Sequence, residues 1–259
     1  MSTPCWRLVV TPPAPGAENM ALDEALMERA GATGEWVMRV YSWLAPTVSL
    51  GRNQAARGRY DVARIGELGY GIVRRPTGGR AILHAREITY SVTAPVVDAG
   101  DLMPSYFRIN ELLVDALRAL GVEAEVAAPT ERSTAPSMAP CFDHPSAGEL
   151  TFGGRKLAGS AQWRSNGALL QHGSILIADD QTELASLTIG GGLSIPAPAT
   201  LDEALGWTPQ VRDVSEALGD AIASLEGTPP SELEIDGDLR ARTTALVVRY
   251  TDDQWTWRR

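Results

Sequence analysis

Lysine is nearly absent from this chain of 259 residues, and cysteine and histidine are scarce. Arginine supplies 22 of the 23 basic residues, and the single lysine is Lys156. Two cysteines, Cys5 and Cys141, do not make a disulfide framework in a chain of this length, and three dispersed histidines do not predict a zinc site. No apolar run approaches the roughly 20 residues of a membrane-spanning helix. We therefore expect neither a metal site nor a membrane span.

The start of the chain and its net charge narrow the compartment and the partners. Residues 1–13 lack the basic segment and the following apolar segment of a secretory signal, so we expect a cytoplasmic protein. The formal net charge is −9, which disfavours nonspecific binding to nucleic acid or to anionic membranes, because both require a positive surface. Hydrophobic residues make up 44% of the chain, as is usual for a globular protein.

Strand-like segments, tight turns and late helices predict an α+β fold with a single domain over residues 1–259. We expect a central mixed, mostly antiparallel sheet flanked by helices, with its core at about 30–225 and a helical C-terminal segment at about 211–259 packed on it. The clearest amphipathic helix spans 104–120, between Pro104 and Gly121. Later helices are expected at roughly 181–188, 200–205, 211–226 and 230–247.

Lys156 lies in the stretch TFGGRKLAGSAQ, a pattern that is typical of a β-hairpin with Gly153-Gly154 as a two-residue turn. In this register Thr151 faces Lys156 and Leu150 faces Leu157. The buried face of the hairpin would then carry Leu150, Phe152 and Leu157.

The register also predicts a direction for the lysine side chain. Lys156 is expected on the opposite face, with Ala158 and Ser160, where small neighbours leave room for a ligand. A simpler interpretation is a diagonal cross-strand ion pair between Lys156 and Glu149, which contributes at most about 1 kcal/mol if it is exposed. Both interpretations stay open at this point.

A proline-rich stretch without periodicity, residues 128–148, precedes the hairpin and contains Cys141. Long segments of this kind inside a compact domain are usually functional or disordered. Cys141 is either an inert thiol or a nucleophile, and only the thiolate form attacks. A nearby ammonium favours the thiolate, so Lys156 is a candidate to activate Cys141 while it donates to a substrate carbonyl.

A second cluster follows a predicted strand in the segment RRPTGGRAILHAREITYSV. Residues 76–79 form a tight turn whose glycines allow the backbone to approach a ligand, and arginines surround it with positive charge. A solvated β-turn explains the same pattern. His84 and His172 are more typical of hydrogen-bonded structural histidines than of catalytic bases.

Taken together, these segments resemble the biotin/lipoate protein ligase and lipoyltransferase family. RRPTGGRAILHAREITYSV is similar to the Arg-Arg-x-Ser/Thr-Gly-Gly signature of that family, and GRKLAGSAQWRSNGALLQHGSILI to its Lys-x-x-Gly-Ser-Ala and His-Gly-Ser/Thr segments. The similarity begins at WRLV and reaches the tail RYTDDQWTWRR, so it covers nearly the whole chain.

Within the family, this chain departs from the ATP-dependent lipoate ligases. It has Arg80 where those ligases have a third glycine, and Ala85 follows His84 where they have aspartate. The segment APCFDHPSAGEL resembles instead the cysteine-dependent octanoyltransferase branch that acts on octanoyl-acyl carrier protein. The alternatives are an ATP-dependent ligase that acts through an acyl-adenylate and would need ATP and Mg²⁺, and octanoyl transfer between lipoyl domains.

The resemblance implies an acyltransferase of lipoate biosynthesis that needs no cofactor. Octanoyl-acyl carrier protein would be the donor, and a lysine of an apo lipoyl domain, such as the glycine-cleavage H protein, would be the acceptor. Cys141 would carry the acyl group as a thioester, and Lys156 would activate Cys141 and hold the acyl carbonyl. The residues that the resemblance implies at the substrate are Arg75, Thr77, Gly78, Gly79, His84, Gly159, Ser160 and His172.

The charge of the donor adds one expectation about the surface. Acyl carrier proteins are acidic, and so is this chain. We therefore expect the arginines of residues 52–59 and 74–80 to form a local basic docking surface.

Overall fold

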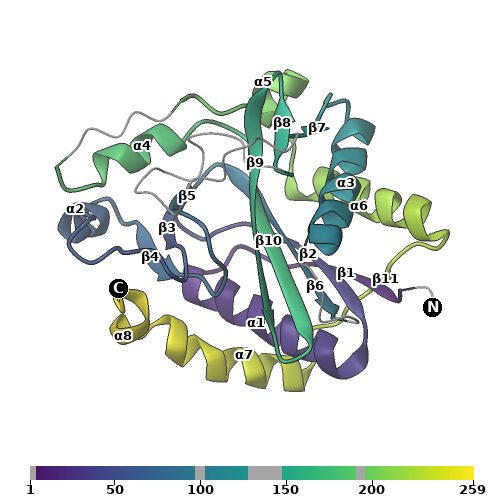
Figure 1. The fold of residues 1–259 in the computed structure, drawn as a ribbon, viewed down its shortest axis with the longest axis horizontal. Coiled ribbons are helices and arrows are strands. Elements are labelled where there is room, and N and C mark those ends of the chain that lie inside the picture. The colour runs from purple at the N-terminus through teal and green to yellow at the C-terminus, as the bar shows by residue number, and fades with distance from the viewer. Residues whose placement is uncertain (1–3, 97–102, 128–147, 191–195) are drawn as a thin grey trace.

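The computed structural model describes residues 4–96, 103–127, 148–190 and 196–259 (Figure 1). Two sheets organise these residues, one with eight strands and one with three. In order across the larger sheet, the strands are β11 (Ser231–Glu232), β1 (Trp6–Val10), β2 (Trp36–Tyr41), β6 (Glu87–Pro95), β10 (Ala168–Leu176), β9 (Arg155–Ser165), β8 (Leu150–Phe152) and β7 (Glu125–Val126). The smaller sheet has the order β4 (Gly71–Arg74), β3 (Thr47–Leu50) and β5 (Ile82–His84).

Most strand pairs are antiparallel, and the parallel ones are β11 with β1, β1 with β2, and β3 with β4. Helices cover the sheets: α1 (Gly16–Thr33), α2 (Val62–Glu67), α3 (Met103–Ala119), α4 (Gln181–Ser186), α5 (Leu201–Leu205), α6 (Val211–Glu226), α7 (Gly237–Tyr250) and α8 (Asp253–Thr256). The predicted α+β class, with a mixed and mostly antiparallel sheet flanked by helices, is confirmed. No helix in the described ranges is both long and apolar enough to cross a bilayer.

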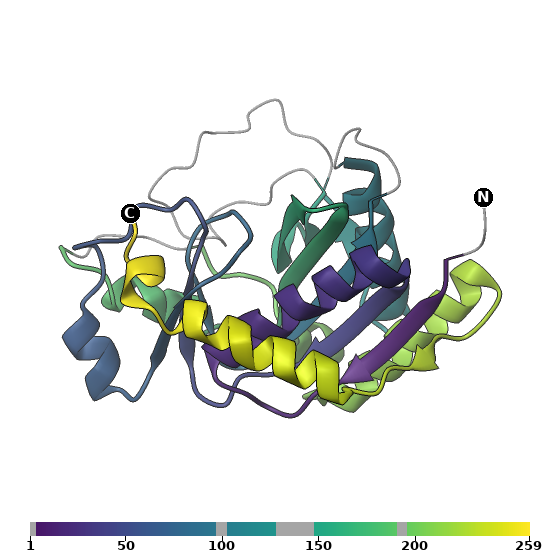
Figure 2. The ribbon, with the colours of Figure 1, turned by 90° about the horizontal axis from the view of Figure 1, so that it is seen from below.

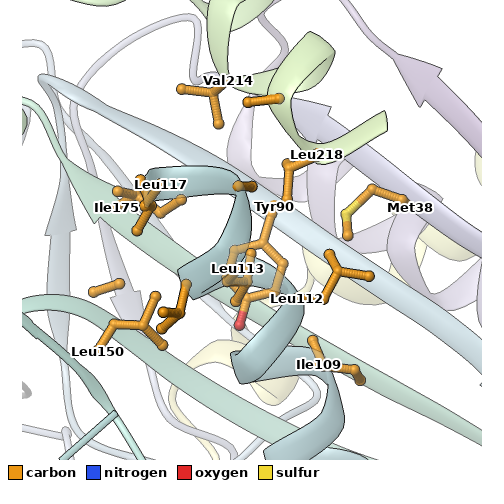
Figure 3. Packing of buried hydrophobic residues seen from close by; sticks show 14 of the residues in the cluster. Met38, Tyr90, Ile109, Leu112, Leu113, Leu117, Leu150, Ile175, Val214 and Leu218 are labelled. Carbon is orange, nitrogen blue, oxygen red and sulfur yellow. The ribbon is translucent and has the colours of Figure 1, made fainter. Parts of the chain in front are cut away.

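The main hydrophobic core lies between the large sheet and the helices α3 and α6 (Figure 3). Strand β6 shows how the sequence builds it, because alternate residues of a strand point to opposite faces of the sheet. Ile88, Tyr90 and Val92 belong to this core, whereas Thr89 and Ser91 point to the other face. The apolar residues of α3 recur at helical spacing and cover the same surface.

Helices α1 and α7 pack together on the other side of the large sheet (Figure 2). A second core forms there from residues of α1, α7, β1 and β2. Unlike α3, helix α1 also buries polar residues, among them Asn19, Asp23 and Glu24. The buried region on this side of the sheet therefore contains polar as well as apolar side chains.

The late helices lie close to their expected positions, with one exception. Helix α6 spans residues 211–226 as expected, and α4 and α5 lie within 181–188 and 200–205. The helix expected at 230–247 begins only at Gly237 and ends at Tyr250. Residues 231–232 pair with β1 instead, and Asp236 caps the helix by accepting a hydrogen bond from the amide of Leu239.

The hairpin of β8 and β9 has the expected turn but not the full expected register. Gly153 and Gly154 both have positive φ, 56° and 73°, as a type I′ turn requires. Thr151 faces Lys156 as expected, but the next pair joins Leu150 to Ala158. Leu157 is thus the extra residue of a β-bulge, a feature that the simple alternation of the sequence does not reveal.

Candidate active site

The glycine-rich turn after β4 is built around the side chain of Arg75. Its guanidinium is buried and donates hydrogen bonds to the carbonyl oxygens of Ser49 (2.9 Å), Gly78 (3.0 Å) and Arg80 (2.7 Å). Three acceptors at different points of the chain fix the path of the turn against β3. Arg75 therefore shapes the turn from within, and its described bonds all go to protein carbonyl or hydroxyl groups.

Gly51 and Gly79 are the glycines that the contact between the turn and the end of β3 requires. A Cβ at Gly51 would lie 1.9 Å from the carbonyl oxygen of Gly79, closer than any real Cβ contact. Gly79 itself has φ of 91°, in the left-handed region that favours glycine. The turn is consequently held close to the end of β3, with Gly79 exposed and Gly78 half-buried.

Thr77 joins this turn to the large sheet through a buried polar network. The Thr77 hydroxyl lies 2.6 Å from Nε2 of His172 on β10, and Nδ1 of the same ring lies 3.1 Å from Oδ2 of Asp23 on α1. Asp23 also accepts from the Arg39 guanidinium at 2.7 Å and from the hydroxyls of Tyr41 and Ser91, each at 2.8 Å. The network thus connects the turn, the sheet and the helix.

The charges in this network can be assigned from its surroundings. Burial by itself would raise the pKa of Asp23, but the Arg39 charge and the bonds from His172 and Ser91 outweigh it and hold that pKa below its ordinary value. Burial lowers the pKa of His172, although Asp23 acts in the opposite direction. His172 is therefore neutral near pH 7, with its proton on Nδ1 toward Asp23 and Nε2 accepting from the Thr77 hydroxyl.

Asp23 and Arg39 are the parts of this network that the sequence interpretation missed. The sequence nevertheless indicates that both residues are buried. Asp23 lies among apolar residues on the stripe of α1 that contains Met20 and Met27. Arg39 likewise interrupts an apolar strand. Charged residues at such positions are almost never buried unless they are paired, so two opposite charges on neighbouring apolar elements can predict each other.

The other face of β9 and β10 carries a second buried network. Tyr90 shares a hydrogen bond of 2.7 Å with Ser160 and accepts one of 3.1 Å from the Gln171 amide, which also donates to Asn110 at 2.8 Å. Burial raises the pKa of Tyr90 to about 12. Ser160 is therefore committed to the sheet on the α3 side. No described hydrogen bond joins it to the turn that carries Thr77.

Gly173 on β10 has no room for a side chain at this point. A Cβ at Gly173 would lie 2.7 Å from the Gly159 carbonyl oxygen and 2.6 Å from the ring of Tyr90. On the opposite face of β9, Ala161 lies beside Gly79, 3.9 Å from where a Cβ at that glycine would be. Strand β9 thus separates the two networks, with the glycine turn on one side and Ser160 on the other.

Lys156 is buried and paired, contrary to the expected open face. Its Nζ donates to Oε1 of Glu149 at 2.6 Å, and only 3% of the residue is exposed. The ion pair with Glu149 is therefore confirmed, but as a buried pair. Ala158, expected on an accessible face beside the lysine, belongs to the same core as Leu150 and Leu157 because of the bulge.

His84 lies apart from the turn. Its ring stacks on that of Trp43 with 3.9 Å between centroids, and its Nδ1 lies 3.4 Å from Oε1 of Glu87. Among the described contacts none connects His84 to Thr77 or His172. Cys141 lies outside the described residues, so its contact with Lys156 stays a prediction.

The model of the lipoyl protein ligase A/B catalytic domain matches residues 15–223. This range includes both networks, the glycine turn and the hairpin of Lys156. The chain belongs to that family. The expected resemblance to biotin and lipoate protein ligases is thereby confirmed.

Relatives that match along the full length identify the kind of enzyme within the lipoyl protein ligase A/B family. The chain is 38% identical over 277 residues to the octanoyltransferase LipM of Kyrpidia tusciae, with 98% of this chain and 99% of the relative covered. It is 40% identical over 280 residues to the octanoyltransferase LipM of Moorella thermoacetica, with both chains fully covered. These relatives confirm that the protein is an acyltransferase. A solved structure of lipoate-protein ligase A bound with ATP shares the fold, with a TM-score of 0.81, 22% identity and 99% of each chain covered.

Proposed function

We propose that the protein transfers an octanoyl group from octanoyl-acyl carrier protein to a lysine of an apo lipoyl domain, with the glycine-cleavage H protein as the expected acceptor. The observation that carries this proposal is the full-length match to proteins named octanoyltransferase LipM. It agrees with the sequence features that depart from the ATP-dependent ligases, Arg80 after the two glycines and Cys141 before the hairpin.

The first step forms an acyl-enzyme on Cys141. The thiolate attacks the thioester carbonyl, the carrier thiolate leaves, and the octanoyl group remains on the cysteine as a new thioester. In the second step the neutral amine of the acceptor lysine attacks this thioester, an amide forms, and the departing Cys141 thiolate takes the proton that the amine loses. Both donors are already activated thioesters, so the sequence of steps needs no nucleotide.

Lys156 is proposed to stabilise the negative charge of both steps. Its ammonium donates to Glu149, the residue just before β8, and this bond directs it inside the fold. A positive charge in a buried site acts strongly on a nearby thiolate or on the oxyanion of a tetrahedral intermediate. Glu149 would position the lysine and moderate its charge.

The glycine turn is proposed to line the acyl site on the face of β9 opposite to Ser160. Its backbone is fixed by Arg75 and, through Thr77, by His172 and Asp23. Backbone amides that are held in place in advance are effective oxyanion donors, because no rearrangement is needed when charge develops. His172 acts in this account as a positioning residue that orients Thr77.

Trapping the acyl-enzyme tests the proposal. The protein is incubated with octanoyl-acyl carrier protein in the absence of ATP and of any acceptor, and its intact mass is measured. We expect a mass increase of one octanoyl group on Cys141 and none in Cys141→Ala, with Cys5→Ala as the matched control that still acylates. Addition of an apo H protein should discharge the adduct and acylate the acceptor.

The two alternatives give different results in the same assay. An ATP-dependent ligase would modify the acceptor from octanoic acid and ATP, and it would keep that activity in Cys141→Ala. Transfer between lipoyl domains would require an octanoylated lipoyl domain as the donor. Activity that persists in Cys141→Ala without an adduct would refute the proposal.

A further inference from the structure

Arginines from two distant parts of the chain meet beside the glycine turn. The loop after β3 supplies Arg52, Arg57 and Arg59, and the end of the chain supplies Arg258 and Arg259. The amides of residues 56 and 57 donate to the main-chain oxygen of Arg259, each at 3.0 Å. In Figure 2 the C-terminus and α8 lie next to this loop. We call these five residues the arginine surface.

Trp255 on α8 gives the arginine surface a rigid base. The guanidinium carbons of Arg258 and Arg52 lie 4.3 Å and 5.7 Å from the centre of its ring, and that of Arg249 lies at 4.5 Å. Arg258 also donates to the carbonyl oxygen of Arg52 at 3.1 Å. Stacking and main-chain bonds therefore hold several like charges together.

These arginines are not paired with acidic side chains among the described residues. Asp252, which is close in sequence, caps α8 by accepting from the amide of Gln254. Burial, and then the charges of Arg52, Arg259 and Arg249, lowers the pKa of Arg258. Several arginines without an acidic partner among the described side chains thus lie close together on a protein whose net charge is −9.

The structure corrects the composition expected for such a surface. Arg74 and Arg75 are buried, and Arg74 donates to the carbonyl oxygens of Gly51 (2.6 Å), Gln54 (2.9 Å) and Thr256 (2.7 Å). These arginines join the loop, the turn and the tail together, whereas Arg57, Arg59 and Arg259 are exposed. Arg258 and Arg259 of the C-terminal tail take the place that the sequence interpretation gave to Arg74 and Arg75, whereas Arg80 is half-buried.

The arginine surface adjoins the proposed acyl site. The Arg52 amide donates to the carbonyl oxygen of Thr77 at 2.8 Å, and its guanidinium lies 4.9 Å from the ring centre of Trp163 on β9. A macromolecule that contacts the exposed arginines would therefore lie next to the glycine turn. An acyl group on a flexible arm could reach the turn from there.

We propose that the arginine surface is the docking site for the acidic acyl carrier protein that donates the acyl group. This inference rests on the proposed function and adds the place of contact. An acyl carrier protein presents acidic helices beside an arm that carries a phosphodiester, and guanidinium groups bind both carboxylates and phosphates well. The acceptor lipoyl domain reacts through a lysine and brings no phosphodiester, so the donor fits this surface better.

Charge reversal at two exposed arginines tests the docking site. The variant is Arg57→Glu with Arg59→Glu, and the control is Arg212→Glu with Arg240→Glu, which changes the net charge equally. The control residues are exposed and belong to α6 and the first turn of α7, which lie away from α8 (Figure 1). Each protein is assayed with octanoyl-acyl carrier protein and with octanoyl-pantetheine, a neutral donor without a protein partner.

We expect the Arg57/Arg59 variant to raise the KM for the carrier protein about tenfold with kcat little changed, and to lower the salt dependence of that KM. The kinetics with octanoyl-pantetheine and those of the control variant should match the wild type. An unchanged KM for the carrier protein, or an increase in the acceptor KM alone, would overturn the docking site while the transferase function stands.

A binding measurement separates the two proposals. The dissociation constant of fluorescently labelled octanoyl-acyl carrier protein is measured by anisotropy for the wild type and both variants, without acceptor. Weaker binding to the Arg57/Arg59 variant than to the wild type supports the docking site. If the wild type binds the carrier protein but transfers octanoyl groups from neither donor, the proposed function fails and the docking site stands. Equal binding to all three proteins overturns the docking site.

Discussion

The buried ion pair of Lys156 and Glu149 is costly for the native state, because both charges lose their water. A buried pair of this kind often contributes less to stability than apolar residues of the same volume. Stability alone is therefore a weak reason to keep a lysine at this position in a chain that otherwise uses arginine. Chemistry at the site is a stronger reason, since an ammonium is compact and an arginine fork directs its donors differently.

Substitution of Lys156 separates these two reasons. In Lys156→Met the buried Glu149 carboxylate loses the bond from the ammonium, so we expect a loss of about 3–5 kcal/mol in the free energy of unfolding, measured in urea. The double variant Lys156→Met with Glu149→Leu should recover most of this stability but none of the octanoyl transfer.

The conservative variant tests the amine itself. Lys156→Arg keeps the charge opposite Glu149 but not the shape of the ammonium, so we expect it to fold and to lose at least about tenfold in transfer rate. Urea unfolding and the rate with octanoyl-acyl carrier protein are measured on the same preparation. A rate equal to that of the wild type would show that any cation suffices at this position.

His172 should make the stability of the protein dependent on pH. Its pKa is lowered in the folded state, so the unfolded chain binds more protons once the pH falls below about 6.5. Stability from this residue is complete above that pH and decreases as the pH falls toward the folded-state pKa, by at most about 1.4 kcal/mol per pH unit. Asp23, whose pKa is also lowered, acts in a separate window below about pH 3.9.

The variant His172→Gln removes this titration. We expect a lower melting temperature than the wild type at pH 7.5, because the bonds to Thr77 and Asp23 are weakened. Between pH 7.5 and 5.5, however, its melting temperature should fall less than that of the wild type. Parallel decreases in both proteins would show that His172 does not titrate on unfolding. The melting temperatures of both proteins are measured by differential scanning calorimetry at four pH values.

At the scale of elements, the glycine turn depends on its contact with the end of β3. Gly51→Ala would place a Cβ 1.9 Å from the Gly79 carbonyl oxygen, so the turn must move. We expect a loss of about 1–3 kcal/mol in stability and of at least about tenfold in transfer rate, because a displacement of 1 Å in a site is costly. Gly66→Ala in α2, where no atom lies within 4 Å, is the control and should be slightly stabilising.

The elements that could be predicted from the sequence are those whose conformation depends mainly on neighbouring residues in the chain. The Gly153-Gly154 turn follows from the backbone conformation that a two-residue hairpin needs, and α6 follows from its apolar period. The bulge at Leu157 depends on packing by both faces of β9, and local alternation does not encode it. The partners of His172 come from α1 and from the turn, far away in the sequence, so only the fold brings them together.

At the scale of the whole molecule, the C-terminal helices connect the two sheets. Helix α7 packs on α1 beside the large sheet, and α8 contacts β4 of the small sheet. The indole of Trp255 donates to the carbonyl oxygen of Arg74 at 2.8 Å, and the Arg74 guanidinium donates to that of Thr256. The arginine surface and the glycine turn therefore depend on a segment that lies outside the range matched by the catalytic-domain family.

We expect Trp255→Ala to destabilise the small sheet more than the large sheet. The variant loses the indole bond to Arg74, the edge contact with Tyr250 and the base of the arginine surface, and we expect about 2 kcal/mol of destabilisation for this half-buried ring. Hydrogen exchange followed by mass spectrometry should show faster exchange at 47–50 and 71–74 than in β10. Trp207→Ala, at an exposed indole, is the control and should leave both unchanged. An equal acceleration in both sheets would mean that the tail stabilises the fold as a whole and does not join one sheet to the other.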